Sequence, residues 1–319
     1  MIRYDESDLR RAAAAGIQAP SMYNSQPWLF RLDDGAIEVL SDPARQLTVA
    51  DAGGGWAMRL ALGSATYNAR LALAWGGAPA DVKLLPDPDR PEVIARLTPG
   101  RHRPPTYAER DLYTAIERRY SHRDPFWPDP VPADVRVRLI ESARAEGAWL
   151  DLLVGMTALT GFSEIAHSAD RVLRRDMRYQ AELITWTDTE DAPDGIPVAA
   201  AATVGEPQDL IPQRNFGHRR RAAGRDYEPE PLVGILGTAG DRKLDQVMAG
   251  QALQHVLLAA TDAGLATSMI SQPIEVPAAR DQLRRSLGRT GFPQIAFRVG
   301  YGRPGHPTPR RDVEAAILH

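Results

Sequence analysis

The stretch Ala19-Pro-Ser-Met-Tyr-Asn-Ser-Gln-Pro-Trp28 lies at a predicted junction between a helix and a strand. Its two prolines fix φ and remove two backbone N–H groups, so the backbone between them is held open. Four side chains in that frame donate or accept hydrogen bonds, those of Ser21, Asn24, Ser25 and Gln26. The frame suits a planar ligand with several heteroatoms, and an ordinary Asx or Ser turn ahead of a strand would also explain it.

The composition indicates a soluble globular chain. Its 319 residues are 43% hydrophobic and 25% charged, enough for one large core or two ordinary ones. No run approaches the roughly 18 apolar residues of a membrane span. A net charge of −3 gives no global basic field, so we expect neither nucleic acid nor membrane as a partner. The first eight residues lack the basic and apolar regions of an export signal, which favours a cytoplasmic location.

Residue usage argues against several kinds of chemistry. The chain has no cysteine, which excludes disulfides, zinc–thiolate sites, iron–sulfur clusters and thiol nucleophiles. The seven histidines show no metal-binding spacing, and no nucleophile motif is present, so we expect no metal and no catalytic side chain. His122 is expected to be exposed. Gly300–Gly305 matches G-x-G-x-x-G, but the prolines that follow prevent the helix that would hold a pyrophosphate, and Gly53–Gly55 lacks the Lys-Ser/Thr of a P-loop.

The chain resembles itself in two places, in the same order. Residues 28–32 recur as residues 149–153, and residues 63–72 recur as residues 250–259. Each copy is predicted to form a helix, a strand, a long helix ending in glycine and a further strand, the last at residues 81–85 and 267–271. The pattern favours an internal duplication.

The predicted halves are residues 1–105 and 106–319, with residues 85–105 as a bridge rich in proline and charge. Further helices are predicted at residues 108–119 and 132–146, and a strand at 293–301. Trp28 and Gly63 are 35 residues apart, whereas Trp149 and Gly250 are 101 apart, so the second copy is 66 residues longer. The added segment, about residues 157–231, has helical periodicity up to residue 186 and little pattern from 188 onward. An insertion of this length favours a lid.

The loop that opens this section resembles the P-S-x-x-N-x-Q-P-W signature of the nitroreductase-like flavoprotein superfamily. Glu182-Leu-Ile-Thr-Trp186, Asp194-Gly-Ile-Pro197 and Pro309-Arg-Arg311 resemble more narrowly its actinobacterial Acg branch, so the resemblance spans nearly the whole chain. It implies an α+β nitroreductase-like fold in which one duplicated chain mimics the homodimer of the family. A monomer would then suffice, with a higher oligomer left open.

The resemblance also implies a composite FMN site. In the family, the loop of one subunit holds the flavin ring and an R-x-S-x-R/K segment of the other holds the phosphate. The phosphate residues would be Arg119, Ser121 and Arg123, although a basic helix end explains that segment equally well. The loop residues assigned to the cofactor are Pro20, Ser21, Met22, Asn24 and Gln26. Only the first half has the loop and only the second has the phosphate segment, so we expect one non-covalent FMN per chain.

Two further segments complete the implied site. Ser271 and Gln272 stand where the family presents a backbone N–H to flavin N5, but many active nitroreductases have Glu-Gly where this chain has Gln-Pro. Either Arg310 or Arg311 would add a cation to the phosphate, and their spacing does not choose between them.

The flavin would carry the redox chemistry, so hydride transfer requires no side-chain acid or base. The expected activity is hydride transfer from NAD(P)H to a nitro- or quinone-type acceptor. The alternative is a non-catalytic protein that stores FMN beneath a closed lid. A third reading, an interaction module that has lost flavin, is disfavoured because one complete set of site motifs survives.

Overall fold

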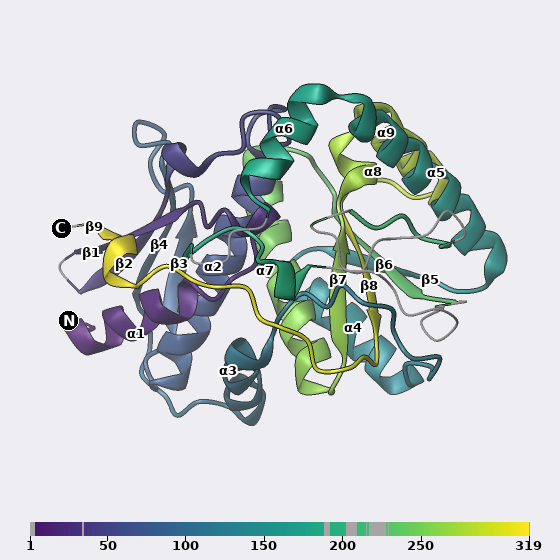
Figure 1. Ribbon diagram of the computed structural model, residues 1–319. Helices are drawn as coiled ribbons and strands as arrows, with labels where there is room; N and C mark the ends of the chain where they lie inside the picture. The colour runs from purple at the N-terminus through teal and green to yellow at the C-terminus, as the bar shows by residue number, and fades with distance from the viewer. Residues whose placement is uncertain are drawn as a thin grey trace.

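The computed structural model describes residues 4–33, 35–187, 192–201, 209–214, 216, 228 and 230–318. Two β-sheets lie on either side of a central pair of long helices, α2 (Trp56–Trp75) and α7 (Lys243–Asp262) (Figure 1). Both helices are buried along most of their length because apolar residues, mainly alanine and leucine, occupy most of their positions. The central pair therefore forms the contact between the two parts of the molecule.

The first sheet has the strand order β3-β4-β2-β1-β9. Its strands are β1 (Trp28–Asp33), β2 (Ala36–Ser41), β3 (Ala80–Leu84), β4 (Val93–Pro99) and β9 (Ile317–Leu318). Strand β4 corrects the prediction of a bridge at residues 85–105, because it pairs antiparallel with both β2 and β3. Its apolar residues fill the core of the first sheet, although the prolines around them resemble those of a linker.

The second sheet has the order β5-β6-β8-β7, and all its pairs are antiparallel. Its strands are β5 (Trp149–Leu153), β6 (Leu232–Thr238), β7 (Ala266–Ile270) and β8 (Phe292–Gly300). The predicted helices at residues 108–119 and 132–146 are present as α3 (Tyr107–Arg118) and α4 (Ala133–Ala145). The strand predicted at residues 293–301 is β8.

The same element order occurs twice. Helix α1 (Glu6–Gly16), β1, α2 and β3 are matched by α4, β5, α7 and β7. Helices α2 and α7 cross at Gly63 and Gly250, where a Cβ on Gly63 would lie 2.1 Å from the carbonyl oxygen of Val247 and 2.9 Å from Cα of Gly250. Such contact between two helix backbones requires glycine at both positions.

The C-terminal tail returns to the first sheet. After β8 it runs back across the molecule, and β9 pairs in parallel with β1 (Figure 1). The short 3₁₀ segments are Met22–Asn24, Pro43–Arg45, Val198–Ala200 and Glu314–Ala316. The tail thereby brings residues from the end of the chain to the loop that precedes β1.

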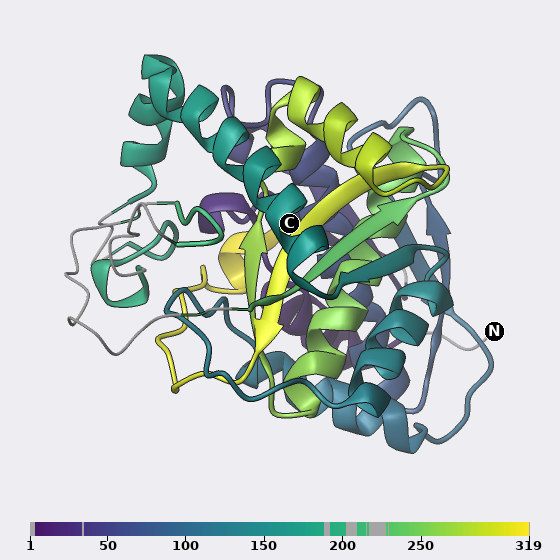
Figure 2. The ribbon, with the colours of Figure 1, turned by 90° about the vertical axis from the view of Figure 1, so that its right-hand side faces the viewer.

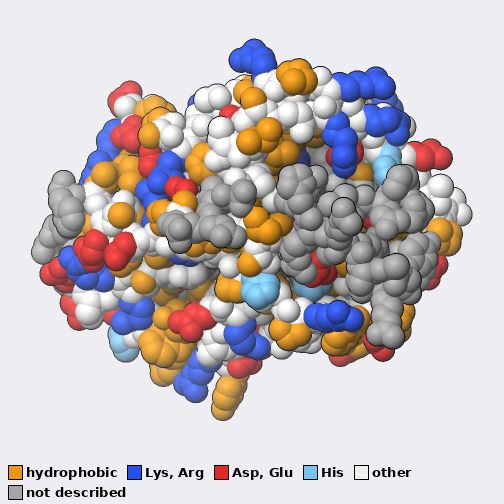
Figure 3. All heavy atoms as spheres, viewed as in Figure 1, with side chains coloured by type: hydrophobic (Ala, Val, Ile, Leu, Met, Phe, Trp, Pro, Cys, Tyr) orange, Lys and Arg blue, Asp and Glu red, His pale blue; other side chains and the backbone are white. Residues whose placement is uncertain are grey.

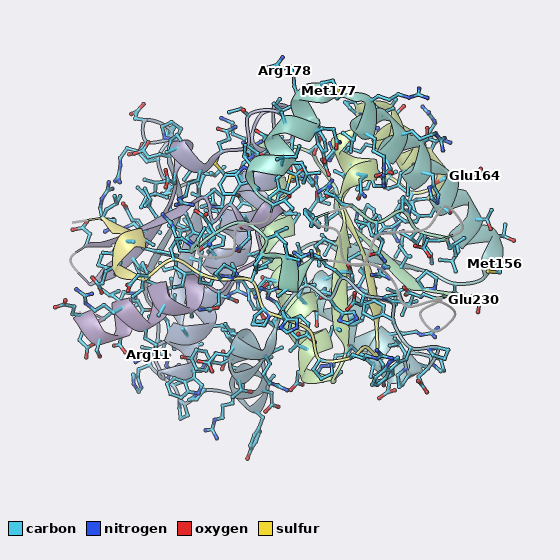
Figure 4. The ribbon with its side chains drawn as sticks, in the orientation of Figure 1. Arg11, Met156, Glu164, Met177, Arg178 and Glu230 are labelled. Atoms are coloured by element: carbon cyan, nitrogen blue, oxygen red, sulfur yellow. The ribbon has the colours of Figure 1, made fainter. Side chains whose placement is uncertain are left out.

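The first part of the insertion is helical, as predicted. It forms α5 (Met156–Arg175) and α6 (Met177–Thr185), which arch over the top of the molecule from Met156 to a turn at Met177 and Arg178 (Figures 2 and 4). The carboxylate of Asp176 caps α6 by accepting from the backbone N–H groups of Arg178 and Tyr179. Helix α5 packs on α8 (Gln272–Glu275) and α9 (Pro277–Ser286). Much of the unpatterned part, residues 188–191, 202–208, 215, 217–227 and 229, lies outside the described residues.

Side chains of both charge signs are interspersed on the face shown in Figure 3. Within the described ranges, none of the helices has both the length and the apolarity of a membrane-spanning segment.

Candidate functional site

One cavity between the two sheets gathers predicted residues from three separate segments. It is lined by Pro20, Ser21 and Met22 of the loop before β1, by Ser121 and Arg123, and by Ser271 and Gln272 after β7. Helices α2 and α7 supply an apolar wall with Trp56, Leu60 and Leu253. Seven of the twelve predicted site residues therefore share a single cavity.

The loop before β1 has an unusual backbone. Tyr23, Asn24 and Gln26 have φ values of 54°, 56° and 53°, in the left-handed region that residues with a Cβ rarely adopt. A residue in this conformation destabilises the fold by on the order of 1–3 kcal/mol, so it persists only where surrounding contacts impose the conformation. The hydroxyl oxygen of Ser21 fixes the bend by accepting from the backbone N–H of Gln26 at 3.0 Å. Strain held in this way is typical of functional loops.

Asn24 and Gln26 position the loop and do not line the cavity wall. The Asn24 amide donates to the carbonyl oxygens of Gly195 at 3.0 Å and Pro309 at 2.9 Å. The Gln26 amide donates to the carbonyl oxygen of Pro193 at 2.7 Å. These two side chains therefore connect the loop to both the insertion and the C-terminal tail.

Three arginines form a positively charged cluster beside the cavity. Arg119 donates to the carbonyl oxygen of Gln18 at 3.2 Å, Arg123 to that of Ala200 at 2.7 Å, and Arg310 to the side-chain oxygen of Asn24 at 2.9 Å. Among the described residues none of the three has a carboxylate partner. Nε and Nη1 of Arg119 and Nε of Arg310 are buried without any hydrogen-bond partner there.

The pKa values of the three guanidinium groups are lowered, as expected for buried positive charge without an opposite charge nearby among the described residues. Burial lowers the pKa of Arg119 to about 10. Burial, together with the neighbouring arginines, lowers the pKa of Arg123 to about 10 and that of Arg310 to about 9. Because nearby cations disfavour one another, an anion placed among them would satisfy the free N–H groups and offset the charge. The residues present thus fit the phosphate of FMN.

The structure distinguishes Arg310 from Arg311. The Arg311 guanidinium donates to the backbone oxygens of Trp28 at 2.7 Å and Gln26 at 3.3 Å, and it lies 3.8 Å from a carboxylate oxygen of Asp42. It therefore ties the tail to β1, whereas Arg310 joins the cluster with Arg119 and Arg123.

The segment that carries Ser121 is held against β7. Ser121 forms an isolated parallel bridge with Thr267, and the backbone N–H of His122 donates to the Thr267 carbonyl oxygen at 2.8 Å. His122 is only 2% exposed and stacks on Phe126, so the expectation that it is exposed was wrong. Burial also lowers the pKa of His122, which favours the neutral ring.

No group of three metal-ligating side chains occurs in the part of the chain that the structure describes.

Sequence reasoning missed Arg214, which lines the cavity from the insertion. Its guanidinium pairs with Glu275 at 2.5 Å and lies over the rings of Tyr23, Tyr179 and Phe216 at 5.1, 5.7 and 6.0 Å. The Tyr179 hydroxyl donates to the other Glu275 oxygen at 2.6 Å. Arg214 lies in the unpatterned part of the insertion, where the sequence offers no periodicity or motif to identify it. Arg298, on β8, also lines the cavity and was missed for the same lack of a motif.

The insertion is fastened to the first half through α6. The Glu182 carboxylate accepts from the backbone N–H groups of Thr48 at 2.6 Å, Val49 at 3.0 Å and Ala50 at 2.7 Å, and from the Thr48 hydroxyl at 3.0 Å. Asp194 pairs with Arg45 at 2.6 Å. A small apolar cluster joins the same surfaces, made of Tyr23, Leu47, Tyr179 and Leu183.

Comparison with known proteins places this chain among nitroreductase relatives, although no family model matches it. It is 31% identical to "Putative NAD(P)H nitroreductase Rv3131" of Mycobacterium tuberculosis, over 98% of this chain and 92% of that one. It is 29% identical to "Putative NAD(P)H nitroreductase acg" of the same organism, over 96% and 94% of the two chains. A third relative there, "Uncharacterized protein Rv3127", is 29% identical over 97% and 92%.

Among solved structures, the chain is similar to a nitroreductase with bound FMN from Desulfitobacterium hafniense, with a TM-score of 0.43 and 14% identity over 66% of this chain and 97% of that one. A nitroreductase with bound FMN from Bacteroides fragilis gives a TM-score of 0.40 and 15% identity over 65% and 97%. Because the 31% identity to Rv3131 extends over nearly the full length of both proteins, the chain belongs to the nitroreductase-like family, in the branch that contains Acg.

Proposed function

We propose that this protein binds one FMN non-covalently between its two halves and acts as an NAD(P)H-dependent oxidoreductase of the nitroreductase type. One observation carries the proposal: Arg119, Arg123 and Arg310 bring positive charge without carboxylate partners, among the described residues, to the edge of a cavity lined by a strained loop. Membership of a family whose relatives are named nitroreductases supports it.

The halves would be residues 1–105 and 106–319, and each supplies a different part of the site. Arg119, Ser121 and Arg123 of the second half would hold the phosphate, with Arg310 from the tail as a further cation. Pro20, Ser21 and Met22 of the first half would contact the ring. Because one chain provides both parts, a monomer should suffice for binding.

When bound, FMN supplies hydride acceptance from NAD(P)H and delivery to a nitro- or quinone-type acceptor. The protein would orient the cofactor and exclude water. Ser271 and Gln272 follow directly after β7, are both at most 8% exposed, and line the same cavity as the loop. Pro273 cannot donate a backbone N–H, so any donor to the ring from this turn must come from Ser271 or Gln272.

The second candidate, FMN storage, is favoured by the contacts of residues 192–201. This segment accepts two hydrogen bonds from the loop before β1. The Gln26 amide donates to the carbonyl oxygen of Pro193 at 2.7 Å, and the Asn24 amide donates to that of Gly195 at 3.0 Å. Arg123 donates to its Ala200 carbonyl oxygen at 2.7 Å. If these contacts persist with FMN bound, they would restrict access by a nicotinamide.

The two candidates are separated by the absorbance spectrum of the purified protein before and after anaerobic NADPH. For the oxidoreductase, NADPH should bleach the flavin band, and a nitro- or quinone-type acceptor should restore it. For the storage protein, NADPH and NADH should leave the band unchanged while dithionite bleaches it. A colourless protein that takes up no added FMN would contradict both candidates.

A further inference from the structure

A second cavity, of about 720 Å³, lies beyond Trp56 from the flavin cavity, and Trp56 lines both. Its walls are the loop that includes Gly53 and Gly54, the first turns of α2 and α7, helices α8 and α9, and the start of β8. The volume falls within the range of about 300–1,000 Å³ that is usual for small-molecule sites. None of the residues assigned to the flavin phosphate lines it.

The positive ends of two long helices meet at this cavity. Arg59 and Gln246 each lie four residues before the glycine at which their helices cross. They are in contact, because Nε of Arg59 donates to the side-chain oxygen of Gln246 at 2.7 Å. Both residues lie in the first two turns of their helices, so α2 and α7 present their N-termini to the same side. Each N-terminus carries partial positive charge, but carboxylates already meet it, that of Asp51 at α2 and that of Asp245 at α7. The positive charge that remains for a ligand therefore comes from side chains.

The carboxylates that line the cavity are already engaged. Asp51 accepts from the backbone N–H groups of Ala57 at 2.9 Å and Met58 at 3.0 Å. The remaining three pair with arginines: Asp241 with Arg280 at 2.7 Å, Glu275 with Arg214 at 2.5 Å, and Asp281 with Arg285.

Three cations that line the cavity have no carboxylate within ion-pair distance among the described residues, Arg59, Lys243 and Arg284. Arg59 is only 9% exposed, and its Nη1 and Nη2 have no hydrogen bond within that part of the chain. A Cβ built on Gly55 would lie 3.2 Å from Nη1, so the glycine loop passes directly over the guanidinium. By contrast, Arg284 donates to the carbonyl oxygen of Gly291 at 2.9 Å and lies 4.2 Å from the ring centroid of Phe292.

We propose that this second cavity binds a small organic molecule through its phosphate group, held by Arg59 and Lys243 at the N-termini of α2 and α7. The forked Nη1 and Nη2 groups of Arg59 match a bidentate phosphate contact, and Lys243 adds a point charge from the neighbouring helix. This site is separate from the flavin cavity and does not depend on its redox activity.

The test is isothermal titration of the FMN-saturated protein, in which the arginine cluster of the flavin site is filled. The probes are 5′-AMP, adenosine and inorganic phosphate. We expect 5′-AMP to bind and adenosine not to bind. Arg59→Gln and Lys243→Gln should each weaken 5′-AMP binding by about tenfold or more, as loss of a charge-assisted contact predicts. The control Arg284→Gln, which changes a cation on the same wall, should bind 5′-AMP like the parent.

Three results would overturn the proposal: no binding of 5′-AMP by the parent, equal binding of adenosine, or unchanged affinity in both variants. Binding of inorganic phosphate alone, with no binding of 5′-AMP, would also contradict an organic ligand. Lys243 is exposed, so Lys243→Gln stays informative if Arg59→Gln does not fold. FMN content, read from the flavin absorbance of each variant, reports separately on the flavin site.

Discussion

At the scale of single residues, the arginine cluster brings together buried cations that have no carboxylate partner among the described residues. Burying a cation without an opposite charge is costly, and each of Arg119, Arg123 and Arg310 also disfavours the others. A bound phosphate would offset that cost. We therefore expect bound FMN to raise the free energy of unfolding of the protein.

The first prediction concerns Arg119 and Asn24. Arg119→Ala would remove the proposed charge-assisted phosphate contact, worth about 1.5–3 kcal/mol, or roughly 10- to 150-fold in FMN affinity. Asn24→Ala removes the acceptor for Arg310 and should cost about 0.5–1.5 kcal/mol. Fluorescence titration with FMN measures both. The control Arg118→Ala changes an exposed neighbour and should bind FMN normally, whereas equal affinities for all three would refute the composite site.

Individual residues were predictable where a motif carried them. Motifs identified seven residues that line one cavity in the structure, at positions 20–22, 121, 123, 271 and 272. The choice between Arg310 and Arg311 was not predictable, because adjacent residues of one type in an extended tail point in different directions. Arg214 was missed since it depends on a long-range pair with Glu275.

At the scale of elements, α3 positions the segment that we propose to hold the phosphate, since Arg119 is its C-terminal cap. The helix begins with a capping box in which Thr106 and Glu109 exchange side-chain-to-backbone hydrogen bonds. Arg103 holds the Glu109 carboxylate with contacts of 2.6 and 2.7 Å. This pairing, with the cap, lowers the pKa of Glu109 to about 2.

The second prediction follows from that pKa. A carboxyl whose pKa is lowered by folding stabilises the protein above its unfolded pKa of about 4.5, and the gain disappears as pH falls toward 2. Glu109→Gln should therefore lower the free energy of unfolding by about 1 kcal/mol at pH 7 and have little effect near pH 2. Urea unfolding at both pH values measures this. Glu117→Gln, an exposed change on the same helix, should have no effect, and an equal loss at both pH values would disprove the ionic origin.

The third prediction concerns α6. Glu182→Gln removes the charge that accepts four hydrogen bonds from residues 48–50, so α6 should detach from the first half more often. We expect faster FMN dissociation, by about tenfold for a lost contact of roughly 1.4 kcal/mol, and faster reduction by NADPH. Stopped-flow absorbance measures both rates. Glu164→Gln, exposed on α5 (Figure 4), is the matched control, and unchanged rates in both variants would mean that α6 does not control access.

Elements with strong periodicity were predictable, and pairing partners were not. The long helices and the insertion helices follow from their apolar spacing. Strand β4 lies between prolines and charges, so its sequence resembles a linker until β2 and β3 pair with it. Strand β9 is only two residues long and exists because the tail returns to β1.

At the scale of the whole molecule, the crossing of α2 and α7 holds the halves together. The fourth prediction is that Gly250→Ala destabilises the protein by about 1–3 kcal/mol or more, because the added Cβ would lie 2.2 Å from the carbonyl oxygen of Leu60. Gly161→Ala on α5 has open space around its Cβ and should be neutral or slightly stabilising. Thermal unfolding compares them, and equal melting temperatures would show that the helices separate easily.

If the chain is a duplication in which each half has lost one of two complementary motifs, as we propose, it has one flavin site. The loop exists only before β1 and the phosphate segment only after α3, and the structure brings these two segments to one cavity. The number of FMN molecules per chain therefore tests the central claim most directly. Titration of the protein with FMN, followed by release and absorbance of the bound flavin, should give close to one FMN per chain, and Arg119→Ala should reduce it at equal FMN concentration. A value of two, or no binding at all, would contradict the account.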